Sequence, residues 1–233
     1  MIKYMKEKNK KLLNEWKEWF LFKSIPIIIV HPLNPNLNIK NIISYIEGYI
    51  KNINYIKGIE GIYVGNFDIL KQRRIQSLYN DGVIYVSNFQ DDNTIIDEKV
   101  SKDIVHEIGH SIEKLYELDI YGDKEIEKEF IGKRKRLYDL IYDKNISMSR
   151  EKFLTILDYD LAIDTFLYQE VGYNKLRQVI NGLFLSPYCI TSISEYFGNA
   201  FEEYLTGDKK YVERICPMVY SRLLYIDNIM RKT

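Results

Sequence analysis

Residues 101–115 read SKDIVHEIGHSIEKL and contain the pattern H-E-x-x-H. Apolar residues recur through this stretch at the spacing of one helix face, which predicts a buried helix. On such a helix His106 and His110 stand one turn apart on the same side, about 6 Å from each other. Two imidazoles at this separation suit two corners of a zinc tetrahedron. The apolar positions are Ile104, Val105, Ile108, Ile112 and Leu115.

Glu107 follows the first histidine, so on a helix it points beside a metal held by the two histidines rather than at it. There it could act as the general base that takes a proton from a zinc-activated water. Gly109 suits a buried helix that another backbone approaches closely. The alternative is a surface helix on which two histidines share one side. Only three histidines occur in the chain, however, and two of them fall in this motif.

A catalytic zinc site needs a third protein ligand and leaves its fourth position for water. The remaining histidine, His31, lies far upstream, and a structural or surface role is expected for it. The best candidate is Glu195, in the stretch ISEYFGNAFEEYL (193–205), whose aromatic residues predict a buried helix face. A carboxylate there is costly without a cation, although an ordinary acidic residue at a helix N-terminus is an alternative. If Glu195 is not the third ligand, the alternatives are Glu113, Glu117, Glu202 and Glu203.

Composition limits the possible partners. Lys and Arg together number 33, as do Asp and Glu, so the formal net charge of the 233 residues is zero. This balance argues against a nucleic-acid partner, whose binding rests on surplus basic groups. The longest uncharged runs, 24–39 and 178–194, contain Pro and Asn and fall short of a membrane span.

Charges interrupt every apolar run near the N-terminus, so no secretory signal is expected. Two cysteines, Cys189 and Cys216, are too few for a disulfide framework. We therefore expect a monomer that is cytoplasmic as synthesised. Any delivery outside the cell would follow a route that the sequence does not show.

The pattern along the chain predicts an α+β fold. Strands come first, together with helices, and from residue 97 the spacing is helical almost to the end. Breaks in this helical part are expected near Gly122, Asn145, Gly172 and Ser186–Pro187. The earlier elements are helices at 3–22 and 41–53, strands at 25–30, 61–67 and 82–89, and a linker or short helix at 68–79.

We expect a single domain over 1–233 with the H-E-x-x-H helix at its centre. A small mixed sheet with helices would form an N-terminal lobe over about 1–118, and a mostly helical lobe would follow over about 119–233. The strand at 82–89 could be an edge strand that binds extended substrate by β-strand addition. Its alternation fits a strand buried on both faces equally well, so both interpretations stay open.

These residues together resemble a known family. The motif HEIGH (106–110), Tyr188 and the stretch EYFGNAF (195–201) are similar to the catalytic domain of anthrax toxin lethal factor and its relatives. Those relatives include the small Pro-Pro endopeptidases, which are gluzincin-type zinc proteases. Pro217 and the aromatic-rich stretch 219–230 also resemble the ending of the family.

The resemblance implies a zincin-like fold with one Zn²⁺ per chain. His106, His110 and Glu195 would be the metal ligands, Glu107 the general base, and Tyr188 the donor to the oxyanion. The chain also departs from the family. The interval between His110 and Glu195 is long, so helices around 124–143 and 149–171 are interpreted as an insertion. In addition, Asn199 stands where an acid often supports the first zinc-binding histidine, so this support is expected to be weaker or differently arranged.

The expected function is therefore that of a zinc-dependent endopeptidase acting on a peptide or protein. A toxin-like or effector role rests on family analogy alone. One alternative is a peptide-binding or regulatory module on the same fold, which the intact Glu107 disfavours. Another is a repressor-cleaving metallopeptidase, a class that usually carries a helix-turn-helix motif. No such motif is recognised in the sequence.

Overall fold

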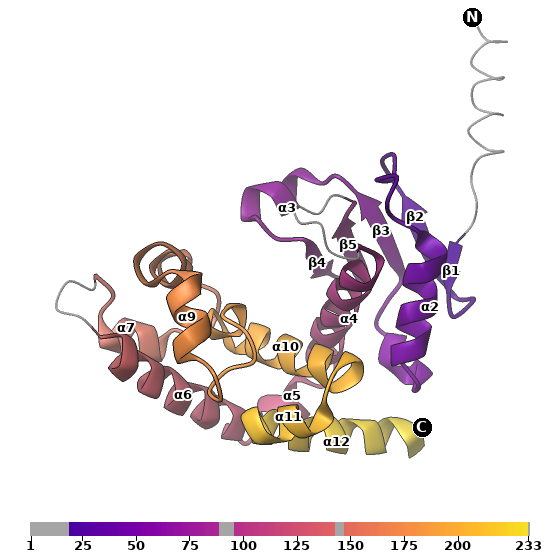
Figure 1. The fold of residues 1–233 in the computed structure, drawn as a ribbon. Coiled ribbons are helices and arrows are strands. Elements are labelled where there is room, and N and C mark those ends of the chain that lie inside the picture. The colour runs from indigo at the N-terminus through magenta and orange to yellow at the C-terminus, as the bar shows by residue number, and fades with distance from the viewer. Residues whose placement is uncertain (1–18, 89–95, 143–146, 233) are drawn as a thin grey trace, which may run out of the picture.

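The computed structural model describes residues 19–88, 96–142 and 147–232. These residues form a five-stranded mixed sheet and a larger helical part, as the predicted α+β class requires. Figure 1 shows the sheet with α2 (Ile39–Tyr49) and α4 (Ile96–Leu115) beside it, while the helices from residue 117 onward form the helical part.

The sheet has the strand order β1-β2-β3-β5-β4. Its three central strands are parallel, and each edge strand runs antiparallel to its neighbour. The central strands bury one face of the sheet, while side chains of the opposite face such as Tyr63 and Tyr85 are half-buried. The buried face carries Ile27, Ile62, Val64, Ile84 and Val86. The strands are β1 (Trp19–Leu21), β2 (Ile25–Ile29), β3 (Gly61–Gly65), β4 (Ser77–Asn80) and β5 (Val83–Ser87).

The edge of the sheet differs from one of the two sequence interpretations. β5 is an interior strand between β3 and β4, so the edge role considered for 82–89 is wrong. β4 is the edge strand beside β5, and it was not predicted. Asp81 and Gly82 join it to β5 with positive φ at both residues, as a two-residue hairpin turn of type I′ requires. The Asp-Gly pair is the sequence signal that indicates this hairpin.

The end of the helix expected over 3–22 is a strand in the structure. Residues 1–18 lie outside the described residues, and Trp19–Leu21 form β1, paired with β2. Phe22 and Lys23 have φ values of 49° and 59°, and this left-handed turn brings the chain back along β1. The helical spacing of the aromatic residues was therefore misleading at this end.

Two helices accompany the sheet. α2 (Ile39–Tyr49) starts after the N-cap Asn38. It ends before residue 53, the end expected from the sequence, and a short 3-10 helix, η1 (Ile53–Ile56), follows it. The 20-residue α4 (Ile96–Leu115) packs against α2, β4 and β5. α3 (Asp68–Arg73) is the short helix expected between two strands.

The helical half carries breaks where the sequence predicts them, at Gly122, Gly172 and Ser186–Pro187, while Asn145 lies outside the described residues. Gly172 has φ of 80°, which favours glycine at that break. Its helices are α5 (Glu117–Tyr121), α6 (Glu125–Ile141), α7 (Arg150–Thr155), α8 (Leu161–Thr165), the π-helix η2 (Phe166–Val171), α9 (Tyr173–Val179), the 3-10 helix η3 (Tyr188–Ile190), α10 (Ile193–Thr206), α11 (Lys209–Ile215) and α12 (Pro217–Lys232).

The two halves meet where α4 packs against α10. A Cβ at Gly109 would lie 3.0 Å from the ring of Phe201, so this glycine makes room for an aromatic side chain of α10 and not for the second backbone that was expected. The last helix, α12, also forms hydrogen bonds with the N-terminal half. Asp227 accepts hydrogen bonds from Asn52 and Tyr55.

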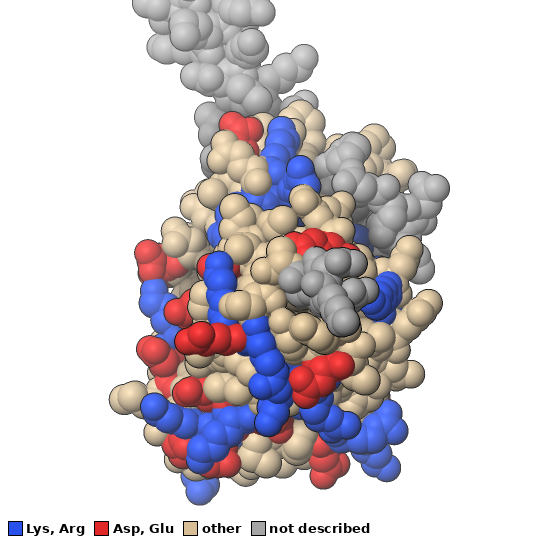
Figure 2. Space-filling model, turned by 90° about the vertical axis from the view of Figure 1, so that its left-hand side faces the viewer, with Lys and Arg blue, Asp and Glu red and all other residues tan. Residues whose placement is uncertain are grey.

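Basic and acidic side chains are interspersed on the face shown in Figure 2, in keeping with the zero net charge. Within the described ranges, no helix combines the length and the apolar character needed to cross a membrane.

Candidate metal centre

The five predicted site residues line one cleft of about 830 Å³. The edge strand β4, the helix α4, the segment around Tyr159 and the start of α10 line it. His106, Glu107, His110, Tyr188 and Glu195 all contribute to its lining.

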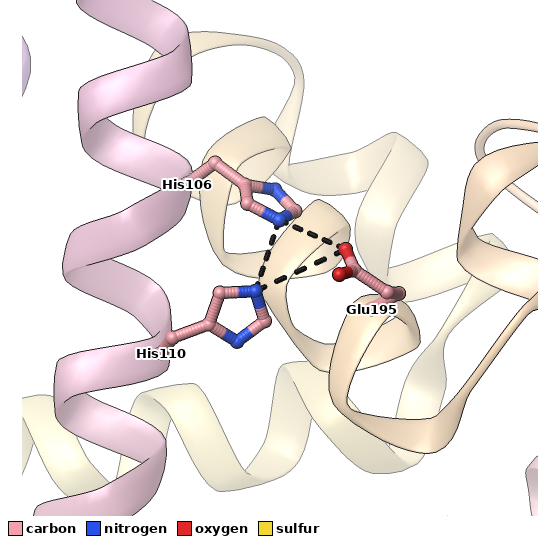
Figure 3. A group of neighbouring side chains, drawn as sticks. All are labelled: His106, His110 and Glu195. Carbon is pink, nitrogen blue, oxygen red and sulfur yellow. Dashed lines mark hydrogen bonds and ion pairs between the residues drawn. The ribbon is translucent and has the colours of Figure 1, made fainter. Parts of the chain in front are cut away.

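Three of these residues converge on one point. His106 and His110 project from successive turns of α4, and Glu195 faces them from the first turn of α10 (Figure 3). The Nε2 atoms of the two imidazoles are 3.1 Å apart. Oε2 of Glu195 lies 3.0 Å from Nε2 of His106 and 3.9 Å from Nε2 of His110.

Local structure fixes the place of Glu195. Ser192 caps α10, and its hydroxyl accepts the backbone N–H of Glu195. Such a cap is typical of a helix N-terminus, where the glutamate three residues later often folds back on the cap residue. Here the carboxylate instead reaches the imidazoles of α4, so the alternative of an ordinary N-terminal acid does not describe its contacts.

The arrangement fits a zinc ion. A tetrahedral ion with bonds of about 2.0–2.1 Å holds its ligand atoms roughly 3.4 Å apart, and the three separations of 3.0, 3.1 and 3.9 Å bracket that value. Gly198 makes room for the two rings, because a Cβ there would lie 2.9 Å from Cε1 of His106 and 3.0 Å from Cε1 of His110. His106, His110 and Glu195 could therefore hold a metal.

Without an ion, these groups form charged pairs with one another. Burial alone would lower the pKa of His106, but the Glu195 and Glu202 carboxylates raise it well above its usual value. Burial also acts to lower the pKa of His110, but the carboxylates of Glu113, Glu195 and Glu107 together outweigh it and raise this pKa. Burial acts to raise the pKa of Glu195, but His106, together with His110 and Tyr188, outweighs it, so the net shift is downward. A bound metal requires neutral imidazoles, so protons compete with it for this site.

Each imidazole has a second carboxylate on its outer nitrogen. Nδ1 of His110 lies 3.0 Å from Oε2 of Glu113, which also accepts the Ser194 hydroxyl at 2.6 Å. Nδ1 of His106 lies 3.5 Å from Oε2 of Glu202. Such partners hold the ring of a metal-binding histidine in place and make it a better ligand. Two of the alternative ligand candidates thus lie behind the rings rather than at their converging nitrogens.

Asn199 serves a different part of the site. Its side chain donates to the backbone oxygen of Glu195 and accepts the hydroxyl of Ser186. Of the two outcomes expected from Asn199, a weaker or a differently arranged support of the first histidine, the structure shows the second. The structure gives that support to Glu202 and uses Asn199 to tie the segment before Tyr188 to α10.

Tyr188 faces the carboxylate of Glu195 from the short helix η3. Burial, and after it the negative charge of Glu195, raises the pKa of its hydroxyl. The hydroxyl therefore stays protonated at neutral pH and can donate a hydrogen bond into the cleft.

Arg134 binds the segment that carries Tyr188 through hydrogen bonds to its backbone. This guanidinium is fully buried and donates to the backbone oxygens of Phe153, Ile156, Ile190 and Thr191. Burial lowers its pKa to about 9, which leaves it protonated at neutral pH. Nothing in the sequence distinguishes Arg134 from the other basic residues of its helix, because its partners are backbone groups from distant segments.

Glu107 is buried beside the metal cluster, at 5% exposure. Its Oε1 accepts the hydroxyl of Ser77, and its Oε2 accepts the backbone N–H of Tyr79, both on β4. Sequence reasoning missed both contacts because it did not predict β4. His31 lies outside the metal cluster and accepts the backbone N–H of Asn66, which agrees with the structural role expected for it.

Comparison with known proteins finds no family model, curated protein or solved structure that matches this chain. The resemblance to the lethal-factor-like zinc proteases therefore stays a prediction from the motif residues.

Proposed function

We propose that the protein is a zinc-dependent endopeptidase. The observation that carries this proposal is the convergence of His106, His110 and Glu195 in the same cleft as the buried carboxylate of Glu107. Two histidines and a glutamate are a ligand set of catalytic zinc, with one position left for water.

The residues of the cleft have distinct roles in this proposal. A zinc ion held there would supply Lewis-acid chemistry, lowering the pKa of a water and polarising the scissile carbonyl. Glu107 accepts a proton from the attacking water and passes it to the leaving nitrogen. The Tyr188 hydroxyl donates a hydrogen bond to the carbonyl oxygen as negative charge develops on it.

The edge strand in the cleft favours an extended peptide as substrate. β4 is an edge strand that lines the cleft, and a peptide lying along it would gain main-chain hydrogen bonds. A toxin-like or effector role is not needed to explain any of these contacts.

The test combines metal analysis with peptide cleavage. We expect about one zinc per chain after reconstitution, and cleavage within a mixed peptide library that a chelator abolishes. Glu107→Gln should keep the zinc and lose nearly all cleavage, because the amide cannot accept the proton. Glu195→Ala should lose zinc affinity as well as cleavage. A folded protein that takes up no zinc would overturn the proposal.

A peptide-binding module is the other outcome of the same experiment. It would take up zinc and bind peptides without cleaving them, and Glu107→Gln would then change nothing.

A further inference from the structure

The edge strand β4 holds both oxygens of the Glu107 carboxylate. Ser77 Oγ donates to Oε1 over 2.7 Å, and the backbone N–H of Tyr79 donates to Oε2 over 2.6 Å. The two donors are therefore a hydroxyl and an amide placed two residues apart on one strand.

The register of the sheet explains why β4 offers these groups. The backbone N–H of Ser87 donates to Gln76, so in this antiparallel pair Leu78 faces Tyr85 as the next hydrogen-bonded pair. Tyr79 lies between such pairs, and its amide points away from β5 toward the cleft. Side chains alternate along a strand, so Ser77 and Tyr79 share the sheet face that meets α4.

We propose that Ser77 is a positioning residue for Glu107, an inference that rests on the proposed function. A glutamate side chain has three rotatable bonds, and a general base works only when it is held within about 0.5 Å of its productive position. The amide of Tyr79 fixes one oxygen, and the hydroxyl of Ser77 fixes the other. Together they select one orientation of the carboxylate.

Ser77 cannot donate to Glu107 and to a substrate at the same time. A serine hydroxyl has one hydrogen to donate, and that of Ser77 is used on Glu107. Removal of the hydroxyl should therefore slow the chemical step and leave substrate affinity almost unchanged. It should also leave zinc affinity unchanged, because Ser77 contacts none of the three candidate ligands within the described residues.

The experiment compares Ser77→Ala, Ser77→Thr and the control Ser24→Ala, which lies in the distant turn between β1 and β2. The substrate is a peptide that the wild-type protein cleaves, and zinc affinity is measured by competition with a chelator. We expect Ser77→Ala to lower kcat about 10-fold, part of the full contribution of a general base. KM and zinc affinity should stay within about twofold, since no substrate or metal contact is lost. Ser77→Thr, which keeps the hydroxyl, should restore most of kcat, and Ser24→Ala should match the wild type.

Three results would overturn the inference. They are an unchanged kcat in Ser77→Ala, a rise in KM without a fall in kcat, and a loss of zinc. Failure of the proposed function is seen separately, as wild-type protein that cleaves no peptide. In that case hydrogen exchange at the Tyr79 amide gives the answer. Exchange should be slow in the wild type and faster in Ser77→Ala, because the carboxylate that accepts this amide is then no longer held by the hydroxyl, and equal rates would refute the inference.

Discussion

His106 and Glu202 are paired through the outer nitrogen of the imidazole, with Nδ1 of the histidine 3.5 Å from Oε2 of the glutamate. Glu202 lies two turns beyond Glu195 on α10, so this helix contributes both the carboxylate at the inner nitrogen and the one at the outer nitrogen of the same ring. For His110 the carboxylate at the outer nitrogen is that of Glu113, which lies on α4 itself.

Glu202→Gln and Glu113→Gln should each weaken zinc binding about 10-fold, because an amide orients the imidazole without the charge that strengthens it as a ligand. Competition with a chelator at pH 7 measures this affinity. Glu203→Gln is the matched control, since the Glu203 carboxylate instead accepts the backbone N–H of Asp208 at the end of α10. Equal affinities in all three variants would mean that the outer carboxylates do not act on the metal.

Gly198→Ala should separate folding from metal binding. Alanine favours the helix by up to about 1 kcal/mol over glycine, so the variant should fold. Its Cβ would nevertheless lie 2.9 Å from the His106 ring and force that ring to move. We expect a clear loss of zinc affinity with an unchanged circular dichroism spectrum. Gly132→Ala on α6, where a Cβ meets nothing within 4 Å, should leave zinc binding as it is.

Tyr188→Phe should lower kcat by roughly 10²–10³-fold, the usual loss for one donor to an oxyanion. Zinc affinity should remain, because the phenol is not one of the three converging ligands. Steady-state kinetics on a cleaved peptide, combined with the chelator competition, checks both statements. Normal turnover would make the hydroxyl a bystander and remove the part of the family resemblance that includes Tyr188.

Arg134→Met should lower the free energy of unfolding by about 3 kcal/mol, because the buried carbonyls it serves lose their donor. Urea unfolding measures this difference. Arg136→Met, two residues away and exposed, should change stability by less than about 0.5 kcal/mol. If the two variants are equally stable, the guanidinium does not hold the segment that carries Tyr188.

Local patterns in the sequence were sufficient for the helix of the H-E-x-x-H motif, the helix of Glu195 and the breaks at Gly122 and Gly172. These features depend on spacing within one element. The edge strand β4 could not be predicted in the same way, because Ser77–Asn80 has no run of β-branched residues and forms a strand only by pairing with β5. The contacts of Ser77, Glu202 and Arg134 join segments far apart in the chain, and hydrophobic periodicity carries no information about them.

The division of the three candidate ligands between two helices has a consequence for the order of events during folding. His106 and His110 can grip an ion as soon as α4 forms, but Glu195 is 89 residues beyond His106 and arrives only when α10 docks. A fragment that ends before α10 would therefore hold zinc weakly, through two nitrogens alone. Tight zinc binding would therefore require that α10 is docked on α4. When α10 first separates from α4 during unfolding, the metal should be released.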